Sequence, residues 1–267
     1  MKKVKNPTLN QRIHRYRGIG RSIERGSFVL IDYIAEIKET GETFDTTIEE
    51  EARERGIHRE DATYEPMLVV VGEGWVLKSL DDSLTGIEVG KPTTIEIPPE
   101  KGFGPRDPSK VRMMPISRFR SQRVRVYPGM QVEIDGKTAV IRTVGAGRVQ
   151  VDFNPPLAGK TLVYTLTVKG ILEKKTERIR ALIHRRIPSV GIGLFKLKTV
   201  KRTMRIELPE EAFFVEGLQF AKRGIANDVQ RFLPEVEAIT FVETFRRRPT
   251  QASAAAPTET EAVQEDN

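Results

Sequence analysis

The side chains that most often perform covalent chemistry are scarce in this sequence. It contains no cysteine, which excludes thiol nucleophiles and disulfide bonds. Its histidines, His14, His58 and His184, are widely separated and have no neighbouring ligand pattern, which argues against a zinc or nickel site. The paired glycines do not combine a strand, a loop, a helix and a lysine as a phosphate-binding loop does. The sequence therefore predicts a site that uses no metal, nucleotide or other cofactor.

Positive charge is concentrated at the start of the chain. Residues 1–27 carry eight Lys or Arg against one Glu, which accounts for the whole net charge of +7. Clustered basic side chains attract phosphate groups and acidic surfaces in a salt-dependent way. Two interpretations of this basic N-terminal arm stay open: contact with the ribosome or RNA, or a solvated, disordered segment. The arm contains a single aromatic residue, Tyr16, and one ring does not make a surface on which bases stack.

Membrane and export signals are not apparent in the sequence. No run approaches the roughly 20 apolar residues that a membrane-spanning helix needs, and the first residues lack the apolar core of a signal peptide. Together with the absence of cysteine, this predicts a cytoplasmic protein with no membrane partner. The length of 267 residues suits two or three domains. Residues 247–267 are rich in Ala, Thr, Pro and acidic side chains, which predicts a disordered tail.

A strand and a helix are predicted next to each other in the middle of the chain. Residues 67–71 form a short Val-rich run that ends at Gly72, which indicates a buried strand followed by a turn. From Val76 the apolar side chains recur on one helical face, with Asp81 on the opposite face. Gly86 ends the helix, because glycine accepts the left-handed conformation there. Alternating strands are predicted around this unit at 27–38, 92–98 and 161–172.

The order of these elements, with several short motifs, resembles the SlyD-like FKBP-type peptidyl-prolyl isomerases. The motifs are Gly-Glu-Gly at 72–74, Val-Leu at 76–77, Phe-Asp-Thr-Thr at 44–47 and Ile-Pro-Pro-Glu-Lys-Gly-Phe-Gly at 97–104. Asn-Pro-Pro-Leu-Ala-Gly-Lys at 154–160 is similar to the Asn-His-Pro-Leu-Ala-Gly-Lys signature of that subfamily, with Pro155 in place of the histidine. The resemblance covers roughly residues 28–172. It implies an α+β fold in which an FKBP-like antiparallel sheet is wrapped on one helix.

The resemblance also implies the domain organisation. The isomerase domain would consist of residues 28–105 and 155–173. Residues 106–154 would form an inserted small β domain with three short strands, similar to the insert-in-flap domain that holds unfolded polypeptide. Residues 174–246 would form a separate C-terminal α+β domain like that of the long archaeal members, which implies a homodimer or partner docking. In that domain, a long helix over residues 209–233 is predicted to bury Phe213, Phe214 and Phe220.

Isomerisation of an X-Pro bond needs no nucleophile. The barrier of about 18–20 kcal/mol comes from amide resonance, and the twisted transition state is less polar than the planar amide. An apolar cup that grips the proline ring therefore favours the transition state. The resemblance assigns catalytic residues to this cup: Tyr33, Phe44, Asp45, Val76, Leu77, Leu80, Phe103 and Tyr164. It assigns Met67 and Leu157 to substrate binding.

Other roles are assigned to a smaller set of residues. Asp45 would orient the substrate, and Leu80 stands where minimal FKBPs have a tryptophan floor. In the insert, Met113, Met114 and Phe119 are assigned to binding unfolded chains, because methionine repacks around varied apolar sequences. The plainer interpretation is that such side chains fill a small core, and each apolar residue of the cup, taken singly, is also more often ordinary core.

The predicted function is isomerisation of X-Pro bonds in unfolded or nascent polypeptides, combined with folding chaperone activity. Two alternatives stay open. The first is a non-catalytic holdase with a degenerate pocket. The second is a ribosome- or RNA-associated factor that is anchored by the basic arm.

Overall fold

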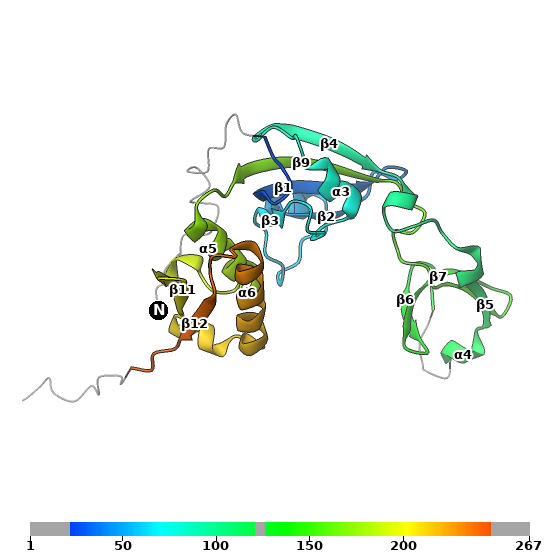
Figure 1. Ribbon diagram of the computed structural model, residues 1–267. Helices are drawn as coiled ribbons and strands as arrows, with labels where there is room; N and C mark the ends of the chain where they lie inside the picture. The colour runs from blue at the N-terminus through cyan, green and yellow to red at the C-terminus, as the bar shows by residue number, and fades with distance from the viewer. Residues whose placement is uncertain (1–21, 121–125, 247–267) are drawn as a thin grey trace, which may run out of the picture.

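The computed structural model describes residues 22–120 and 126–246, which fold into a middle unit, an inserted unit and a C-terminal unit (Figure 1). The inserted unit lies at one end of the molecule and the C-terminal unit at the other. Most of the predicted basic arm (residues 1–21) and the predicted disordered tail (247–267) lie outside the described residues. Among the described helices, none is long and apolar enough to cross a membrane.

The middle unit is built on a five-stranded antiparallel sheet. At its centre, β1 (Phe28–Ile37) pairs along its whole length with β9 (Leu162–Ile171). The far edge of β9 pairs with β4 (Pro92–Ile97), while β2 (Thr43–Thr46) and β3 (Met67–Val70) share the other edge of β1. The period-two patterns at 27–38, 92–98 and 161–172 thus correspond to β1, β4 and β9.

One helix covers one face of this sheet. α3 (Lys78–Ser83) follows β3 through a glycine turn and buries Leu80 and Leu84 in one cluster with Ile31 of β1. Asp81, on the polar face of the predicted helix, is nevertheless buried, at 3% exposure. The Asp81 carboxylate accepts hydrogen bonds of 2.8 Å from the backbone N–H groups of Gly72 and Gly74. Helical periodicity could not reveal a turn that folds back onto the helix.

The middle unit begins earlier than residue 28. Ile23 is fully buried in the core between the sheet and α3. The N–H of Gly26 donates to the carbonyl of Val71 at 2.8 Å, which continues the pairing of β1 with β3 into this segment. Residues 22–27, predicted as the end of the basic arm, are therefore part of the folded unit. A short charged helix, α2 (Glu49–Glu54), follows β2.

The C-terminal unit is an α+β layer of helices on a three-stranded sheet. Its elements are α5 (Lys175–Arg186), η4 (Ile192–Leu194), β10 (Lys196–Val200), β11 (Thr203–Glu207), η5 (Glu210–Phe214), α6 (Leu218–Phe232) and β12 (Ala238–Val242). The central strand β11 is antiparallel to β10 and parallel to β12. Helices α5 and α6 pack against each other over one face of this sheet (Figure 1).

The helix predicted over residues 209–233 begins only at Leu218. Before it, η5 forms one short 3-10 turn, and Gly217 has a φ of 71°, a left-handed conformation that separates the two segments. The prediction that Phe214 and Phe220 are buried is wrong, because these residues are 87% and 83% exposed. Phe213 packs against the core only in part.

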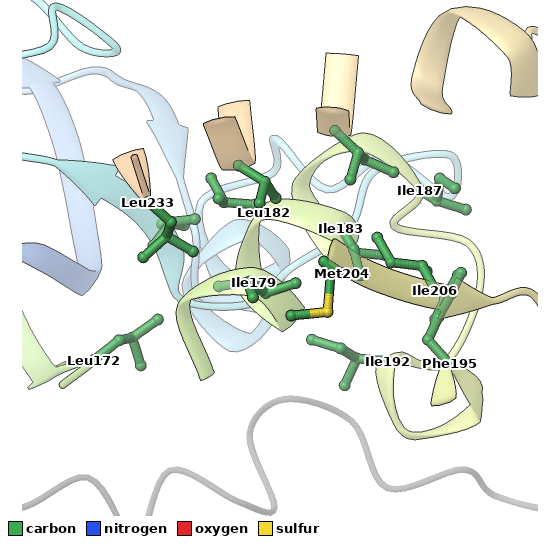
Figure 2. Packing of buried hydrophobic residues seen from close by; sticks show 14 of the residues in the cluster. Leu172, Ile179, Leu182, Ile183, Ile187, Ile192, Phe195, Met204, Ile206 and Leu233 are labelled. Carbon is green, nitrogen blue, oxygen red and sulfur yellow. The ribbon is translucent and has the colours of Figure 1, made fainter. Parts of the chain in front are cut away.

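The C-terminal unit shares a hydrophobic core with the middle unit. Phe28 and Leu30 of β1 belong to the same buried cluster as Leu182 of α5, whose packing with the helices and β11 is seen in Figure 2. Val29 and Ile31 alternate with them and belong to the cluster on the α3 side. The start of β1 is therefore buried on both faces. The C-terminal domain exists as expected but is not separate, because its apolar faces complete the core of the sheet.

The inserted unit has its own small core. It contains β5 (Val111–Pro115), α4 (Ser117–Arg120), β6 (Gln131–Ile134), β7 (Lys137–Gly145) and β8 (Arg148–Asp152), with the strands in the order β5-β8-β7-β6. The first strand, β5, was not among the three predicted, because Arg112 and Pro115 obscure its alternation. Two 3-10 turns, η2 (Pro99–Lys101) and η3 (Pro108–Lys110), lead from the middle unit into the insert.

Candidate active site

A cavity of about 910 Å³ opens between the sheet of the middle unit, the 57–66 loop that precedes β3, and α5 of the C-terminal unit. It is lined by the predicted site residues Tyr33, Phe44, Asp45, Met67, Phe103, Leu157 and Tyr164. They come from distant parts of the chain, and the pairing of β1 with β2 and β9 brings them together.

The aromatic side chains of the cavity contact each other. The ring centroid of Tyr164 lies 5.7 Å from that of Tyr33 and 6.1 Å from that of Phe44, with Phe44 nearly perpendicular at 85°. Edge-to-face packing of this kind is favourable for aromatic rings. Tyr33 and Tyr164 are 8% and 7% exposed, whereas Phe103 is 43% exposed. The two tyrosines therefore form buried walls, and Phe103 offers an open aromatic surface at the edge of the cavity.

One carboxylate is fixed among these rings. The Tyr33 hydroxyl donates a hydrogen bond of 2.7 Å to Oδ2 of Asp45. Burial, and then this carboxylate, raises the pKa of Tyr33 well above its ordinary value. The same two causes, burial first, raise the pKa of Tyr164 to about 12. Both phenols therefore keep their protons at neutral pH, and in the described part of the chain the Tyr164 hydroxyl has no hydrogen-bond partner.

Two threonines hold this arrangement in place. The Thr46 hydroxyl donates to the Tyr33 carbonyl at 2.7 Å, and the Thr47 hydroxyl accepts from the Tyr33 N–H at 3.0 Å. Both threonines are buried. They tie the end of β2 to β1 at Tyr33, and this sets Phe44 and Asp45 against the tyrosine rings. The Phe-Asp-Thr-Thr motif is thus one structural unit, in which the hydroxyl residues position the preceding pair.

Three predicted catalytic residues do not line the cavity. Leu80 is 2% exposed and lies in the core between α3 and the sheet. Val76 and Leu77 are half-buried against the same core. α3 starts only at Lys78, so Val76 and Leu77 precede it, and the side chains of all three residues pack against the core beneath the cavity. Contact of Val76 and Leu77 with substrate, through their backbone groups, stays a prediction.

Comparison with known proteins decides the family. The family models described as FKBP26, IF domain and FKBP26 C-terminal match residues 112–157 and 175–246. The short-type peptidyl-prolyl cis-trans isomerase of Methanocaldococcus jannaschii is 36% identical over 155 residues, which are 58% of this chain and 98% of that protein. The chain belongs to the FKBP-type peptidyl-prolyl cis-trans isomerases.

Other relatives agree with this assignment. The FKBP-type isomerase SlyD of Helicobacter pylori is 30% identical over 51% of this chain and 77% of its own length. The FKBP-type 16 kDa isomerase of Escherichia coli is 26% identical over 57% of this chain and 96% of its own length. The protein is thus an isomerase of the long, SlyD-like type with an IF domain and a C-terminal domain, and the predicted enzyme class is confirmed.

The three predicted binding residues of the IF domain differ in exposure. Met113 is 53% exposed on β5. Met114, the next residue, is half-buried and packs against the core of the insert. Phe119 is 3% exposed, because α4 lies against the sheet and places this ring among Ile141 and Val149. Phe119 is therefore a core residue of the isomerase insert, and of the three only Met113 is mostly exposed.

The Asn-Pro-Pro-Leu-Ala-Gly motif of the isomerase lies mainly at the junction with the insert. The Asn154 side chain accepts from the N–H of Asp107 and donates to its carbonyl, both at 2.9 Å, and so joins the two chains that cross the junction. Gly159 has a φ of 74°, and its N–H donates to the Gly104 carbonyl at 2.8 Å. Pro155 accepts a backbone hydrogen bond of 3.0 Å from Ala158, so the motif forms its turn without the histidine of other members.

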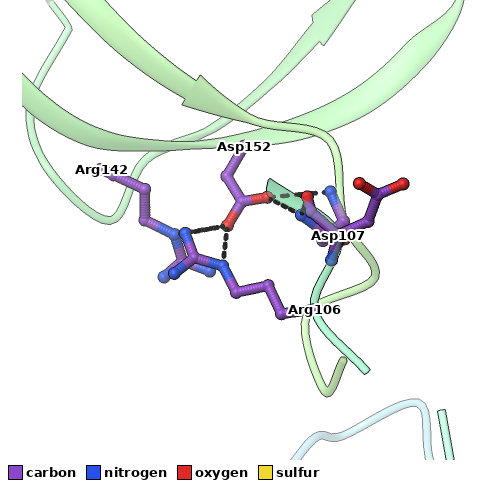
Figure 3. A network of polar contacts seen from close by, with 5 residues as sticks. Arg106, Asp107, Arg142 and Asp152 are labelled. Atoms are coloured by element: carbon purple, nitrogen blue, oxygen red, sulfur yellow. Dashed lines mark hydrogen bonds and ion pairs between the residues drawn. The ribbon is translucent and has the colours of Figure 1, made fainter. Parts of the chain in front are cut away.

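Asp152 is the centre of this junction (Figure 3). Its Oδ2 accepts from Arg106 at 2.8 Å and from Arg142 at 3.0 Å, and its Oδ1 accepts from the Asn154 side chain at 2.7 Å. The residue is fully buried. Burial opposes ionisation of the Asp152 carboxyl, but the hydrogen bonds from Asn154, Arg142 and Arg106 outweigh it and lower its pKa to about 2.

The sequence patterns gave no sign of the second wall of the isomerase cavity, which Trp75 and α5 provide. Arg185 lies over the Trp75 ring, with its Cζ 4.0 Å from the ring centroid, and Phe232 meets the same ring edge-on at 5.7 Å. His184 Nε2 lies 2.5 Å from Oε1 of Glu65 in the loop. The one available signal was Trp75 itself, a single tryptophan directly after the Gly-Glu-Gly turn.

Proposed function

We propose that the cavity between β1, β2 and β9 is the isomerisation site, and that it binds the X-Pro segments of unfolded or nascent polypeptides in the cytoplasm. The proline ring lies among Tyr33, Phe44 and Tyr164. The observation that carries this proposal is the aromatic cluster closed around one hydrogen-bonded carboxylate, with ring centroids 5.7 and 6.1 Å apart. Met67, Leu157 and Phe103 supply further apolar lining.

Catalysis in this proposal is differential binding without proton transfer. The planar amide is the more polar state, and the apolar rings offer it little solvation, whereas the twisted amide loses less when it leaves water. The Tyr33 hydroxyl is committed to Asp45, and this bond keeps the wall rigid. The Tyr164 hydroxyl is a protonated donor for a carbonyl of the client next to the proline, and it anchors the chain while the bond rotates.

The IF domain adds a chaperone function. Met113 and Tyr127 are 53% and 59% exposed, and they give the insert apolar surface for unfolded chains. The insert has a core of its own, so this surface is independent of the cavity. The insert retains an unfolded chain while the proline segments reach the isomerisation site.

The test is the cis-to-trans relaxation of a short X-Pro peptide. Tyr164→Ala removes one wall and is expected to lower kcat/KM by about 10- to 100-fold, since burial of such a side chain is worth about 1.5–3 kcal/mol. Tyr33→Phe keeps the ring but loses the bond to Asp45, so its loss is expected to be smaller. Phe214→Ala is the matched control, because this exposed aromatic residue lies in the C-terminal unit outside the cavity lining. An unchanged rate in folded Tyr164→Ala would refute the proposed site.

A second assay separates the chaperone function. Met113→Ser is expected to weaken suppression of aggregation of an unfolded protein and to leave peptide isomerisation unchanged. Lys137→Ser, an exposed change elsewhere on the insert, is the control. Equal suppression by both variants would remove Met113 from the client surface.

A further inference from the structure

The isomerisation cavity extends beyond the isomerase domain. Its far wall contains Ala181, His184, Arg185 and Pro188 of the C-terminal unit, together with Trp75. The volume of about 910 Å³ lies near the upper end of the range of roughly 300–1,000 Å³ in which proteins enclose whole small ligands. The cavity therefore has room for residues that flank the proline as well as for the proline itself.

The charges around the cavity are unevenly paired. The carboxylates that line it are engaged, Asp45 by the Tyr33 hydroxyl and Glu65 by His184. The cations that line it, Arg59 and Arg185, have no carboxylate within ion-pair distance in the described part of the chain. The guanidinium groups of Arg59 and Arg185 therefore contribute positive charge to the cavity lining without a direct ion pair in the described residues.

Arg185 differs from its neighbour on α5. Arg186 forms an ion pair of 2.8 Å with Asp228, whereas Arg185 is stacked 4.0 Å from the centre of the Trp75 ring. Stacking on an aromatic face leaves the edge of a guanidinium group free, and that edge is suited to a carboxylate held by two hydrogen bonds. The edge-on contact of Phe232 with Trp75 holds the ring that supports Arg185.

The loop across the cavity is attached to the same helix. The 2.5 Å contact between His184 and Glu65 joins α5 to the 57–66 loop, so Arg59 and Arg185 belong to two walls that are held together. In this loop the backbone N–H of Arg59 donates to the Tyr64 hydroxyl at 2.9 Å. The backbone at Arg59 is therefore held in place while its side chain stays available.

We propose that Arg185, stacked on Trp75, forms with Arg59 a second subsite of the isomerisation pocket, which binds an acidic residue of the client chain near the proline. This subsite rests on the proposed function of the cavity. It makes the C-terminal domain a determinant of substrate specificity: α5 supplies the guanidinium, and the isomerase domain supplies the aromatic support and the proline cup.

The experiment uses the full-length protein and peptides with one proline, in which Glu or Gln stands one to four residues before or after it. For at least one position, Glu is expected to raise kcat/KM about five- to tenfold over Gln, the effect of a charge-assisted hydrogen bond that water partly screens. The preference should fall with added salt. It should be lost in Arg185→Gln and Arg59→Gln, and only partly retained in Arg185→Lys, because an ammonium group keeps the charge but not the stacking or the paired hydrogen bonds.

Arg180→Gln is the matched control, because Arg180 lies on α5 outside the cavity lining. Equal kcat/KM for Glu and Gln peptides at every position, or a preference that survives in Arg185→Gln, would overturn the subsite. If the protein accelerated no peptide, the proposed function would fail, and the subsite would then be judged by titration of Trp75, the single tryptophan, with the Glu and Gln peptides. Equal affinity in that titration would also overturn it.

Discussion

The isomerase domain is joined to its two neighbours by different kinds of contact. At the C-terminal domain, Phe28 and Leu30 of the sheet share one buried cluster with Leu182 of α5. At the IF domain, the apolar clusters are separate, and the junction depends on the polar contacts of Asp152 with Arg106 and its neighbours. The junction with the C-terminal domain is a continuous apolar core. The junction with the IF domain is a hub of hydrogen bonds around Asp152, which joins the two chain segments that connect the domains.

This difference explains which neighbour can take part in the cavity. Burial of a large apolar side chain contributes about 1.5–3 kcal/mol, and several together fix two units in one position. The shared core therefore holds α5, and the cavity wall that it forms, in a fixed position relative to the sheet. At the hub, Arg106 and Arg142 remain 49% and 42% exposed, so their ion pairs with Asp152 are partly solvated and contribute less. The insert is held by fewer and weaker contacts.

The largest expected effect tests the apolar junction. Leu182→Ala leaves a cavity in the shared core and is expected to lower the free energy of unfolding by about 2–5 kcal/mol. Trp75 packs against this cluster, so its fluorescence in urea should shift together with the circular dichroism of the whole chain. Ile141→Ala, in the core of the insert, should leave the Trp75 midpoint unchanged. A Leu182→Ala variant with an unaltered Trp75 midpoint would mean that the two units unfold independently.

The next effect tests the polar hub. Asp152→Asn removes the charge that Arg106 and Arg142 share and is expected to destabilise the junction by about 1.5–3 kcal/mol. Hydrogen exchange at residues 106–110 should become faster, while isomerisation of a short peptide stays unchanged. The control is Asp135→Asn, whose ion pair with Arg118 is exposed and worth about 0–1 kcal/mol. If hydrogen exchange at residues 106–110 is equally fast in both variants, Asp152 is not the centre of the junction.

A smaller effect is expected at the glycine of the same junction. A Cβ at Gly159 would lie 2.9 Å from the Cβ of Arg106, and the φ of 74° is unfavourable for alanine. Gly159→Ala should therefore cost about 1–2 kcal/mol for the left-handed conformation, increased by any displacement of Arg106. Gly145→Ala is the control, since that position has open space and no positive φ. Thermal unfolding of the two variants measures the difference.

The smallest effect is the pH dependence of the stability that Asp152 gives to the junction. The pKa of Asp152 is lowered to about 2 in the folded protein, so its stabilisation is complete above its ordinary value of 3.8 and is lost as the pH falls through 2. The difference in insert stability between the wild type and Asp152→Asn should be constant from pH 7 to about 4 and shrink toward pH 2. A constant difference down to pH 2 would contradict the assigned pKa.

Much of the cavity could be predicted from local patterns. The alternation predicted that Tyr33 and Tyr164 lie on strands, and the resemblance to the family assigned them, with Phe44 and Asp45, to one cup, which the pairing of β1 with β2 and β9 assembles. The strands themselves follow from residues adjacent in the chain, whereas the pairing of β1 with β9 joins segments far apart in the chain. The same patterns could not distinguish a side chain that lines a cavity from one that fills the core beneath it. For this reason Leu80, predicted as catalytic, and Phe119, predicted to bind clients, are instead core residues.

The sequence by itself determined the strands of the isomerase domain, several turn glycines and the family. Period-two alternation and turn residues act over short distances, and the family motifs are runs of neighbouring residues. Only the tertiary structure decided that α5 closes the cavity, with Arg185 over Trp75, and that the start of β1 is buried on both faces. The physical reason is that apolar burial is non-directional. The pattern of apolar residues in the sequence therefore does not show which distant element an apolar face will pack against.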